Sequence, residues 1–237
     1  MDIVFNGVIP RDRPEDAHDI LGTFRIVSDG TQMARMPLDF ESFVSSLKEH
    51  HAACLEMRPD KMPGQFKSNE NRAGSTFFVA PELVLGTLET GFEICRGLEL
   101  ALHRAMFIMF LVSEVHPFVD GNGRIGRIMM NAELVGQGEQ RIVIPTVFRN
   151  NYVSALKALS QTGKSSPIIQ VLDFAQRYTT AIRWEDFDTA RAELQATNAF
   201  MDANEAEDRG IRLTLPKQAS QAGGEPNLVM RGFGRRF

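Results

Sequence analysis

The chain has 237 residues, which is enough for one large domain, or one domain with a small appendage, at about 150 residues per domain. Hydrophobic residues make up 43% and charged residues 24%, a balance that excludes the disordered, fibrous and collagen-like classes. With 26 basic and 30 acidic side chains the net charge is −4, so no basic field covers the whole protein and a nucleic-acid partner is not expected.

Cysteine usage and apolar runs indicate the compartment. Only two cysteines, Cys54 and Cys95, are present, too few for a disulfide framework, and we expect both to be small buried side chains. The first residues, MDIVFNGVIPRDR, contain no basic leader before an apolar stretch, so they do not resemble a secretory signal. The longest apolar run, Ala105–Val112, is far shorter than the roughly 20 residues that span a bilayer. We therefore expect a cytoplasmic protein without a membrane partner.

The first part of the chain predicts a mixed segment followed by a helix. Residues 1–38 contain two short runs of strand formers, Asp2–Phe5 and Thr23–Val27, separated by turn formers, and no role is assigned to them. From residue 39 to residue 56 apolar side chains recur at helical spacing, and Asp39 stands where an N-cap belongs. A helix that begins at Asp39 is therefore expected.

This helix carries three residues that resemble soft metal ligands, His50, His51 and Cys54. No fourth ligand with suitable spacing is evident in the sequence. We therefore interpret the three residues as part of a polar helix face rather than as a metal site.

The rest of the chain predicts one hairpin and a series of helices. Gly64–Pro81 contains two short runs of strand formers around a polar turn, which is typical of a hairpin. Leu98–Val115 is apolar almost all round, which predicts a central buried helix, and another helix is expected at Arg124–Val135. Further helices are expected at Pro81–Phe92, Asn151–Ser160, Pro167–Ile182 and Glu185–Phe200. The fold class is therefore all-α.

The most informative segment is His116–Arg127, HPFVDGNGRIGR, which lies where the buried helix stops and the next helix begins. Gly121 and Gly123 allow backbone turns that other residues avoid. The start of a helix there leaves free backbone N–H groups and a positive dipole end facing the loop, which together form an anion site. Because Arg124 and Arg127 lie on one side of the same helix, we expect the anion to be a polyphosphate.

Three further side chains in this segment have the chemistry that phosphoryl-group transfer needs. His116 is a general base that accepts a hydroxyl proton near neutral pH. Asp120 is a hard oxygen ligand, and Mg²⁺ usually takes one or two carboxylates together with substrate phosphates. Asn122 offers an amide donor for a phosphate oxygen.

The segment HPFVDGNGRIGR resembles the signature of the Fic-domain family, His-Pro-Phe-x-(Asp/Glu)-Gly-Asn-Gly-Arg-x-x-Arg, and matches every specified position. Gly64–Pro81 resembles the family's flap hairpin, and Arg141–Tyr152 resembles the segment after the active-site helix. The resemblance implies a compact Fic-type helical bundle with a small β-hairpin flap at residues 39–200. It leaves an N-terminal segment, 1–38, and a C-terminal extension, 201–237, whose basic tail from about residue 216 is expected to be disordered.

The resemblance also implies an activity, the transfer of AMP from ATP to a Ser, Thr or Tyr hydroxyl of a target protein with Mg²⁺ and release of pyrophosphate. It makes His116 the base, Asp120 the Mg²⁺ ligand and Phe118 a core residue. The residues it places on the phosphates are Gly121, Asn122 and Gly123 on the α-phosphate, Arg124 on the β-phosphate and Arg127 on the γ-phosphate. Of these, Asn122 and Arg124 join His116 as catalytic residues. Tyr152, with Phe148, is a candidate for the adenine pocket.

The flap is where the resemblance places the protein substrate, which would pair with the hairpin edge as an added strand. The candidate docking residues are Phe66, Lys67, Thr76 and Phe77. The family's inhibitory motif, Ser/Thr-x-x-x-Glu-Gly/Asn, is absent in strict form, and Ser45-x-x-x-Glu49 is the looser match. Three alternatives are therefore left open: restraint by a separate inhibitory protein, restraint by a relaxed helix, or an enzyme that is not restrained in this way.

Other functions remain compatible with the same residues. A Fic-type enzyme with another donor would transfer UMP, phosphate or phosphocholine, and the reverse reaction would remove AMP from a modified target. A third alternative is that the chain is not an enzyme but a non-catalytic interaction module. The intact His116, Asp120 and Arg127 favour catalysis over that reading.

Overall fold

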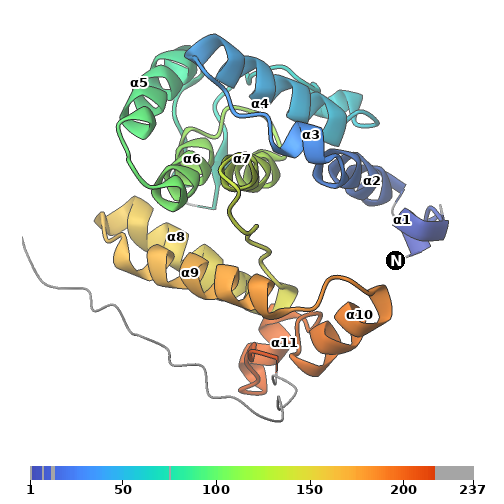
Figure 1. The fold of residues 1–237 in the computed structure, drawn as a ribbon. Coiled ribbons are helices and arrows are strands. Elements are labelled where there is room, and N and C mark those ends of the chain that lie inside the picture. Colours follow the sequence, from blue (N-terminus) through green and yellow to red (C-terminus); the bar gives the residue numbers. More distant parts are fainter. Residues whose placement is uncertain (1, 7, 12–13, 75, 217–237) are drawn as a thin grey trace, which may run out of the picture.

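Two antiparallel helices form the centre of the protein, as Figure 1 shows. The computed structural model describes residues 2–6, 8–11, 14–74 and 76–216. The central helices are α6 (Ala101–Val115) and α7 (Asn122–Gly136). They lie between α4 (Phe40–Cys54) and α5 (Val84–Arg96) on one side and α8 (Arg149–Thr162) and α9 (Ser166–Ala181) on the other. The expected all-α fold is confirmed.

The first core cluster lies between α4, α5, α6 and α7 and fixes the elements nearest His116–Arg127, the expected catalytic segment. Phe43 of α4 is fully buried and stacks on Phe92 of α5 with ring centroids 5.0 Å apart. As expected, Asp39 caps α4: its carboxylate accepts from Ser42 N at 2.8 Å, and Ser42 Oγ accepts from Asp39 N. The start of α4 is therefore set by local sequence, and its orientation by the aromatic core.

The N-terminal segment differs from the sequence-based expectation. The two runs expected as strands, Asp2–Phe5 and Thr23–Val27, lie in helices α1 (Asp2–Asn6) and α2 (Pro14–Ser28), and α3 (Gly30–Met33) follows. Helix α2 packs on α4 and buries side chains at helical spacing. Tertiary packing thus outweighs the strand propensity of this short run.

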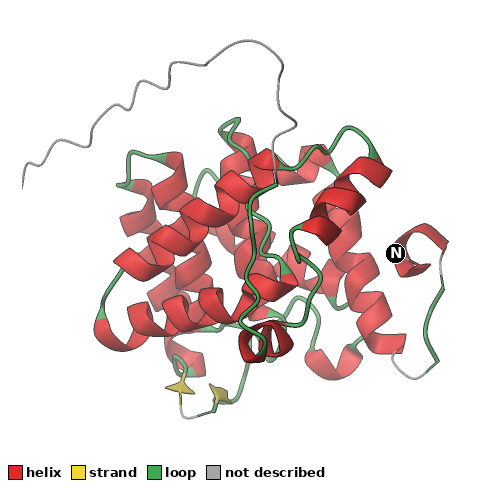
Figure 2. Cartoon of the chain, turned by 90° about the horizontal axis from the view of Figure 1, so that it is seen from below, coloured by secondary structure: helices red, strands yellow, loops and turns green. Residues whose placement is uncertain are grey.

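The flap hairpin is shorter than expected and lies at the periphery of the helices (Figure 2). Its strands are β1 (Arg72–Ala73) and β2 (Thr76–Phe77), which pair antiparallel with Arg72 opposite Phe77. Short 3₁₀ turns, η1 (Pro59–Lys61) and η2 (Pro81–Leu83), flank the flap. The residues that precede β1 run along the catalytic segment instead of joining the sheet.

The C-terminal part adds two further clusters. One packs α8 and α9 against α6 and α7, and the other joins the end of α9 to α10 (Phe187–Ala196), α11 (Ala203–Asp208) and η3 (Thr146–Phe148). The extension after residue 200 thus continues the helical structure as far as α11, while the basic tail from 217 lies outside the described residues. None of the described helices combines the length and the apolar character needed to cross a membrane.

Candidate functional site

The catalytic segment turns sharply between α6 and α7. Helix α6 ends at His116, whose φ of 51° and ψ of 56° are left-handed, and α7 begins after Gly121, whose φ is 76°. Left-handed backbone is natural for glycine but costs energy at His116, so surrounding contacts must hold it. Helix α7 begins at Asn122, so its N-terminus lies at the end of this loop, where the anion site is expected.

Asn122 has a different role from the one expected. Its side chain is 1% exposed, its Oδ1 accepts from Phe118 N at 2.8 Å, and its Nδ2 donates to Phe118 O at 2.8 Å. Because both polar atoms are engaged inside the protein, the amide is not available to a phosphate. Asn122 shapes the loop, and its contribution to an anion would come through the backbone at the start of α7. Phe118 points into the core as expected and is 0% exposed.

His116 is oriented by a backbone carbonyl and by an aromatic ring. Its Nδ1 lies 3.0 Å from Ser113 O, and since a carbonyl only accepts, Nδ1 carries the proton and neutral Nε2 has a free lone pair. The Phe78 ring stacks on the imidazole at 3.7 Å between centroids and 4° between planes. Burial, with a smaller contribution from the charge of Lys67, lowers the pKa of His116 below its usual value, although Ser113 and Asp120 act to raise it. The imidazole is therefore a neutral base at physiological pH.

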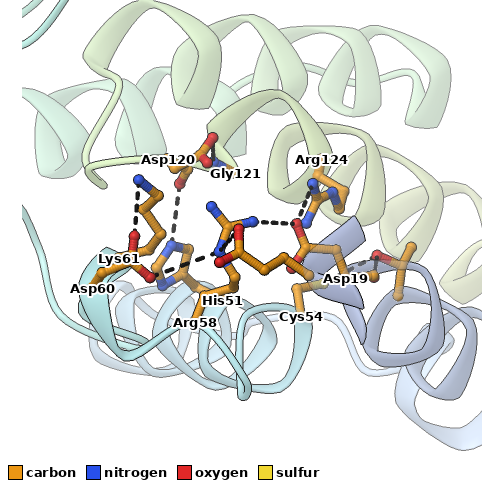
Figure 3. A network of polar contacts seen from close by, with 11 residues as sticks. Asp19, His51, Cys54, Arg58, Asp60, Lys61, Asp120, Gly121 and Arg124 are labelled. Atoms are coloured by element: carbon orange, nitrogen blue, oxygen red, sulfur yellow. Dashed lines mark hydrogen bonds and ion pairs between the residues drawn. The ribbon is translucent and has the colours of Figure 1, made fainter. Parts of the chain in front are cut away.

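His51, expected on a polar helix face, lies under this loop instead (Figure 3). It is 0% exposed, its ring stacks on Phe118 at 3.8 Å, its Nε2 donates to Asp120 O at 3.1 Å, and its Nδ1 accepts from Gly64 N at 2.9 Å. Burial lowers its pKa to about 4, so it is neutral and can both donate and accept. One signal in the sequence pointed this way: His51 follows Leu47 by four residues, on the apolar stripe of α4.

The flap residues divide into two groups. Lys67 and Phe66, expected at the docking edge, pack inward instead: Lys67 is 4% exposed, and the half-buried Phe66 ring lies 5.2 Å from that of Phe118. Those two assignments are wrong because this part of the flap packs on the catalytic segment. Thr76 and Phe77 form β2, and Phe77 is 70% exposed.

The two arginines of α7 point to different partners. Arg124 Nη2 donates to Asp19 Oδ2 of α2 at 3.1 Å, and Arg58 Nη1 lies 3.4 Å from the same oxygen (Figure 3). Asp19 is 5% exposed, so this carboxylate and the two guanidinium groups form a largely buried network. The sequence offered no signal for Asp19, which is 105 residues from Arg124.

Arg127 lies over the first turn of α7. A Cβ placed on Gly123 would be 3.5 Å from Arg127 Nη1, and the positive charge of Arg127 acts to lower the pKa of Tyr152. Tyr152 is 5% exposed and donates to Met109 Sδ at 3.1 Å, and burial raises the pKa of its phenol. The proposed place of Tyr152 in an adenine pocket is therefore corrected: it packs in the core beneath Arg127.

Asp120 is the exposed carboxylate of the loop, and its Oδ1 accepts from Gly121 N at 2.6 Å. Among the described residues no group of three or more His, Cys, Asp or Glu side chains could enclose a metal ion. A single carboxylate beside an anion site fits a Mg²⁺ ion that arrives with phosphates and keeps several waters, rather than a metal in a protein cage.

The fold and the catalytic segment together define a Fic-domain protein. Residues 40–134 match the model of the Fic/DOC family, so a Fic/DOC domain occupies this part of the chain. It is 30% identical over 108 residues to a protein adenylyltransferase Fic of Drosophila willistoni, and 29% identical over 110 residues to that of Drosophila melanogaster. These alignments cover 45% and 46% of this chain but only 21% and 22% of the relatives, so the chain spans about a fifth of their length.

Solved structures share the fold. Fic-1 of C. elegans superposes with a TM-score of 0.59 at 16% identity, covering 83% of this chain and 57% of that one. The BepC protein of Bartonella tribocorum, solved with bound AMPPNP, gives a TM-score of 0.51 at 15% identity, covering 72% of this chain and 90% of that one. At these identities the likeness is one of fold alone.

Proposed function

We propose that the chain is a protein adenylyltransferase, which transfers AMP from ATP to a Ser, Thr or Tyr hydroxyl of a target protein. The observation that carries the proposal is the state of His116: Ser113 O holds Nδ1, burial keeps the ring neutral, and Nε2 is left to accept a proton. This base stands beside the N-terminus of α7, where phosphates are stabilised. The names of the adenylyltransferase relatives support ATP as the donor.

The proposed reaction is an in-line displacement at the α-phosphorus. His116 Nε2 accepts the hydroxyl proton as the hydroxyl oxygen forms its bond to the α-phosphorus. The bond from that phosphorus to the oxygen bridging to the β-phosphate breaks, and pyrophosphate leaves with the bonding electrons. The products are an AMP phosphodiester on the target, pyrophosphate and a protonated His116.

Backbone and arginine donors stabilise the charge of the triphosphate. The N–H groups of the first turn of α7 face the α-phosphate, and Arg127, which lies over that turn, contacts the phosphates beyond it. Arg124 is the other cation, but in its present place it shares Asp19 with Arg58. A phosphate that takes Arg124 must therefore compete with a buried carboxylate.

Mg²⁺ is part of the proposal. Asp120 is the carboxylate that would hold it together with the phosphates. When bound, the ion supplies positive charge that offsets the negative charge building up on the leaving pyrophosphate.

The target protein is proposed to dock on the hairpin. Thr76 and the exposed Phe77 support this placement, since a two-stranded sheet leaves edge N–H and C=O groups free to pair with an extended segment. Phe77→Asp should weaken the modification of a protein target without changing the affinity for ATP.

The test is transfer from α-labelled nucleotides in the presence of Mg²⁺. We expect label from ATP on a target or on the chain itself, loss of label in His116→Ala, and full labelling in His103→Ala, which changes an exposed histidine of α6. Parallel reactions with GTP, CTP and UTP, analysed by intact mass, identify the group transferred. Transfer of UMP or of a bare phosphate would overturn the AMP assignment, and no transfer from any of the four would overturn the proposed function.

A further inference from the structure

Two residues that precede the hairpin bond four consecutive carbonyl groups, from Val115 at the end of α6 to Phe118 in the catalytic segment. Lys67 Nζ donates to Val115 O at 3.3 Å, and Lys67 N donates to Pro117 O at 2.8 Å. Asn71 Nδ2 donates to His116 O at 3.3 Å and to Phe118 O at 2.9 Å. Lys67 Nζ also donates to Asn71 Oδ1 at 2.7 Å, so the two side chains act as one unit.

Two of these carbonyls, those of Val115 and His116, lie at the end of α6, where the last carbonyl groups of a helix lack intrahelical donors. Phe118 O also accepts from Asn122 Nδ2, so there Asn71 adds a second donor. His116 itself is in the left-handed region, a conformation that is unfavourable in a non-glycine residue and persists only when neighbours hold it. The Lys67–Asn71 pair thus bonds the backbone at His116, where the left-handed conformation needs support from neighbouring groups.

The hairpin is joined to His116 at both of its ends. Asn71 directly precedes β1 and bonds the carbonyl of His116, while Phe78 directly follows β2 and stacks on the imidazole. Phe78 N in turn donates to Asn71 O at 3.3 Å, which closes the base of the hairpin. The position of the base is therefore coupled to the position of the hairpin.

We propose that Lys67 and Asn71 are positioning residues for the transfer reaction, which hold His116 in its left-handed conformation and join it to the flap. The effect on the rate of transfer rests on the proposed function, whereas the structural role of Lys67 and Asn71 does not. A displacement of about 1 Å in a reacting group can lower the rate about a hundredfold. Neither residue is expected to touch the nucleotide, so the loss should appear in kcat and not in the KM for ATP.

The charge of Lys67 adds an effect that a purely structural contact lacks. Of the charged groups that act on His116, Lys67 of the flap lowers its pKa, whereas Asp120 of its own loop raises it. Replacement of Lys67 by Met removes the positive charge and should move the acidic limb of the kcat profile to higher pH. Lys67→Arg keeps the charge and should leave that limb where it is.

The kinetic experiment compares Asn71→Ala with Asn69→Ala, the same change at an exposed position two residues earlier. With α-labelled ATP and variants shown by circular dichroism to be folded, Asn71→Ala should lose tenfold to a hundredfold in kcat with KM for ATP within threefold. Asn69→Ala should stay within twofold of the wild type in both. Equal kcat for the two variants, or a loss in Asn71→Ala confined to KM, would overturn the assignment.

A second measurement needs no activity. Hydrogen exchange at residues 115–121 should become faster in Asn71→Ala and in Lys67→Met than in Asn69→Ala, because the bonds that hold the loop are lost. Unchanged exchange in both variants would overturn the proposal. A wild type that transfers no nucleotide but shows this exchange pattern would refute the proposed function and leave the positioning role supported.

Discussion

The neutral state of His51 makes a quantitative prediction about stability and pH. Burial lowers its pKa to about 4, whereas the unfolded chain has the ordinary value of 6.5. At a pH between these two pKa values, His51 is protonated in the unfolded chain and neutral in the folded protein. The stability that depends on neutral His51 is therefore complete above pH 6.5 and is lost as the pH falls toward 4.

The magnitude follows from the difference between the two pKa values. It corresponds to about 3 kcal/mol in total, at about 1.4 kcal/mol for each tenfold change in proton affinity, and about 2 kcal/mol of this is lost between pH 8 and pH 5. The conversion is justified because His51 is fully buried. Protonation would place a second N–H against Gly64 N, which now donates to Nδ1.

The assay is urea unfolding of the wild type and of His51→Gln at pH 8 and pH 5. Glutamine does not titrate in this range, so the stability gap between the two proteins should narrow by about 2 kcal/mol at pH 5. With an m-value of about 2 kcal/mol/M, the difference between the two midpoints should shrink by about 1 M. His103→Gln, at an exposed position of α6, is the control and should keep a constant gap.

A gap between wild type and His51→Gln that is the same at both pH values would refute the reasoning. Other groups that titrate in this range are common to both proteins and cancel in the difference. An unchanged gap would therefore mean that His51 is not held neutral between the amide of Gly64 and the carbonyl of Asp120.

Three further predictions follow from other contacts. Gly22→Ala should lower the free energy of unfolding by about 1–3 kcal/mol, because a Cβ at Gly22 would press on the backbone of α4. Gly86→Ala should raise the free energy of unfolding by roughly 0.5–1 kcal/mol, because Gly86 in α5 has open space around it. Both changes are measured by urea unfolding. Asp19→Asn should tighten ATP binding about threefold to tenfold by calorimetry, because Arg124 loses its competing carboxylate; weaker binding would contradict this. The acidic limb of kcat/KM should lie below pH 6.5, because burial lowers the pKa of His116; a midpoint above 6.5 would contradict the neutral base.

Local sequence was sufficient for most of the helices and for the catalytic segment. The cap at Asp39, the apolar helix that ends at His116 and the glycine that opens α7 each depend on neighbours within a few residues, so their signals are complete in the sequence. The strands expected at Thr23–Val27 failed for the opposite reason, because α2 is a helix by virtue of its packing on α4.

Long-range contacts account for the corrections at the site. From the sequence, Lys67 is expected to be a surface cation on a hairpin. In the structure it is buried and donates a hydrogen bond to the carbonyl of Val115. In the sequence His51 likewise looks like one of several polar residues on a helix, and its role is visible only in the structure, where its ring contacts the carbonyl of Asp120. Val115 and Asp120 are distant in the chain from Lys67 and His51, so no local sequence pattern could predict these two contacts.

The groups on which the proposed chemistry depends are visible in the sequence: a histidine, a helix N-terminus, a carboxylate and two arginines lie within twelve residues, because one loop between two helices places them together. How those groups are held depends on contacts between segments that are distant in the chain. The tertiary structure set the protonation state of His116 through Ser113 O and burial, and it paired Arg124 with Asp19, 105 residues away. The physical reason is that burial and the partners of buried polar groups depend on which distant segments meet, and these determine pKa and orientation.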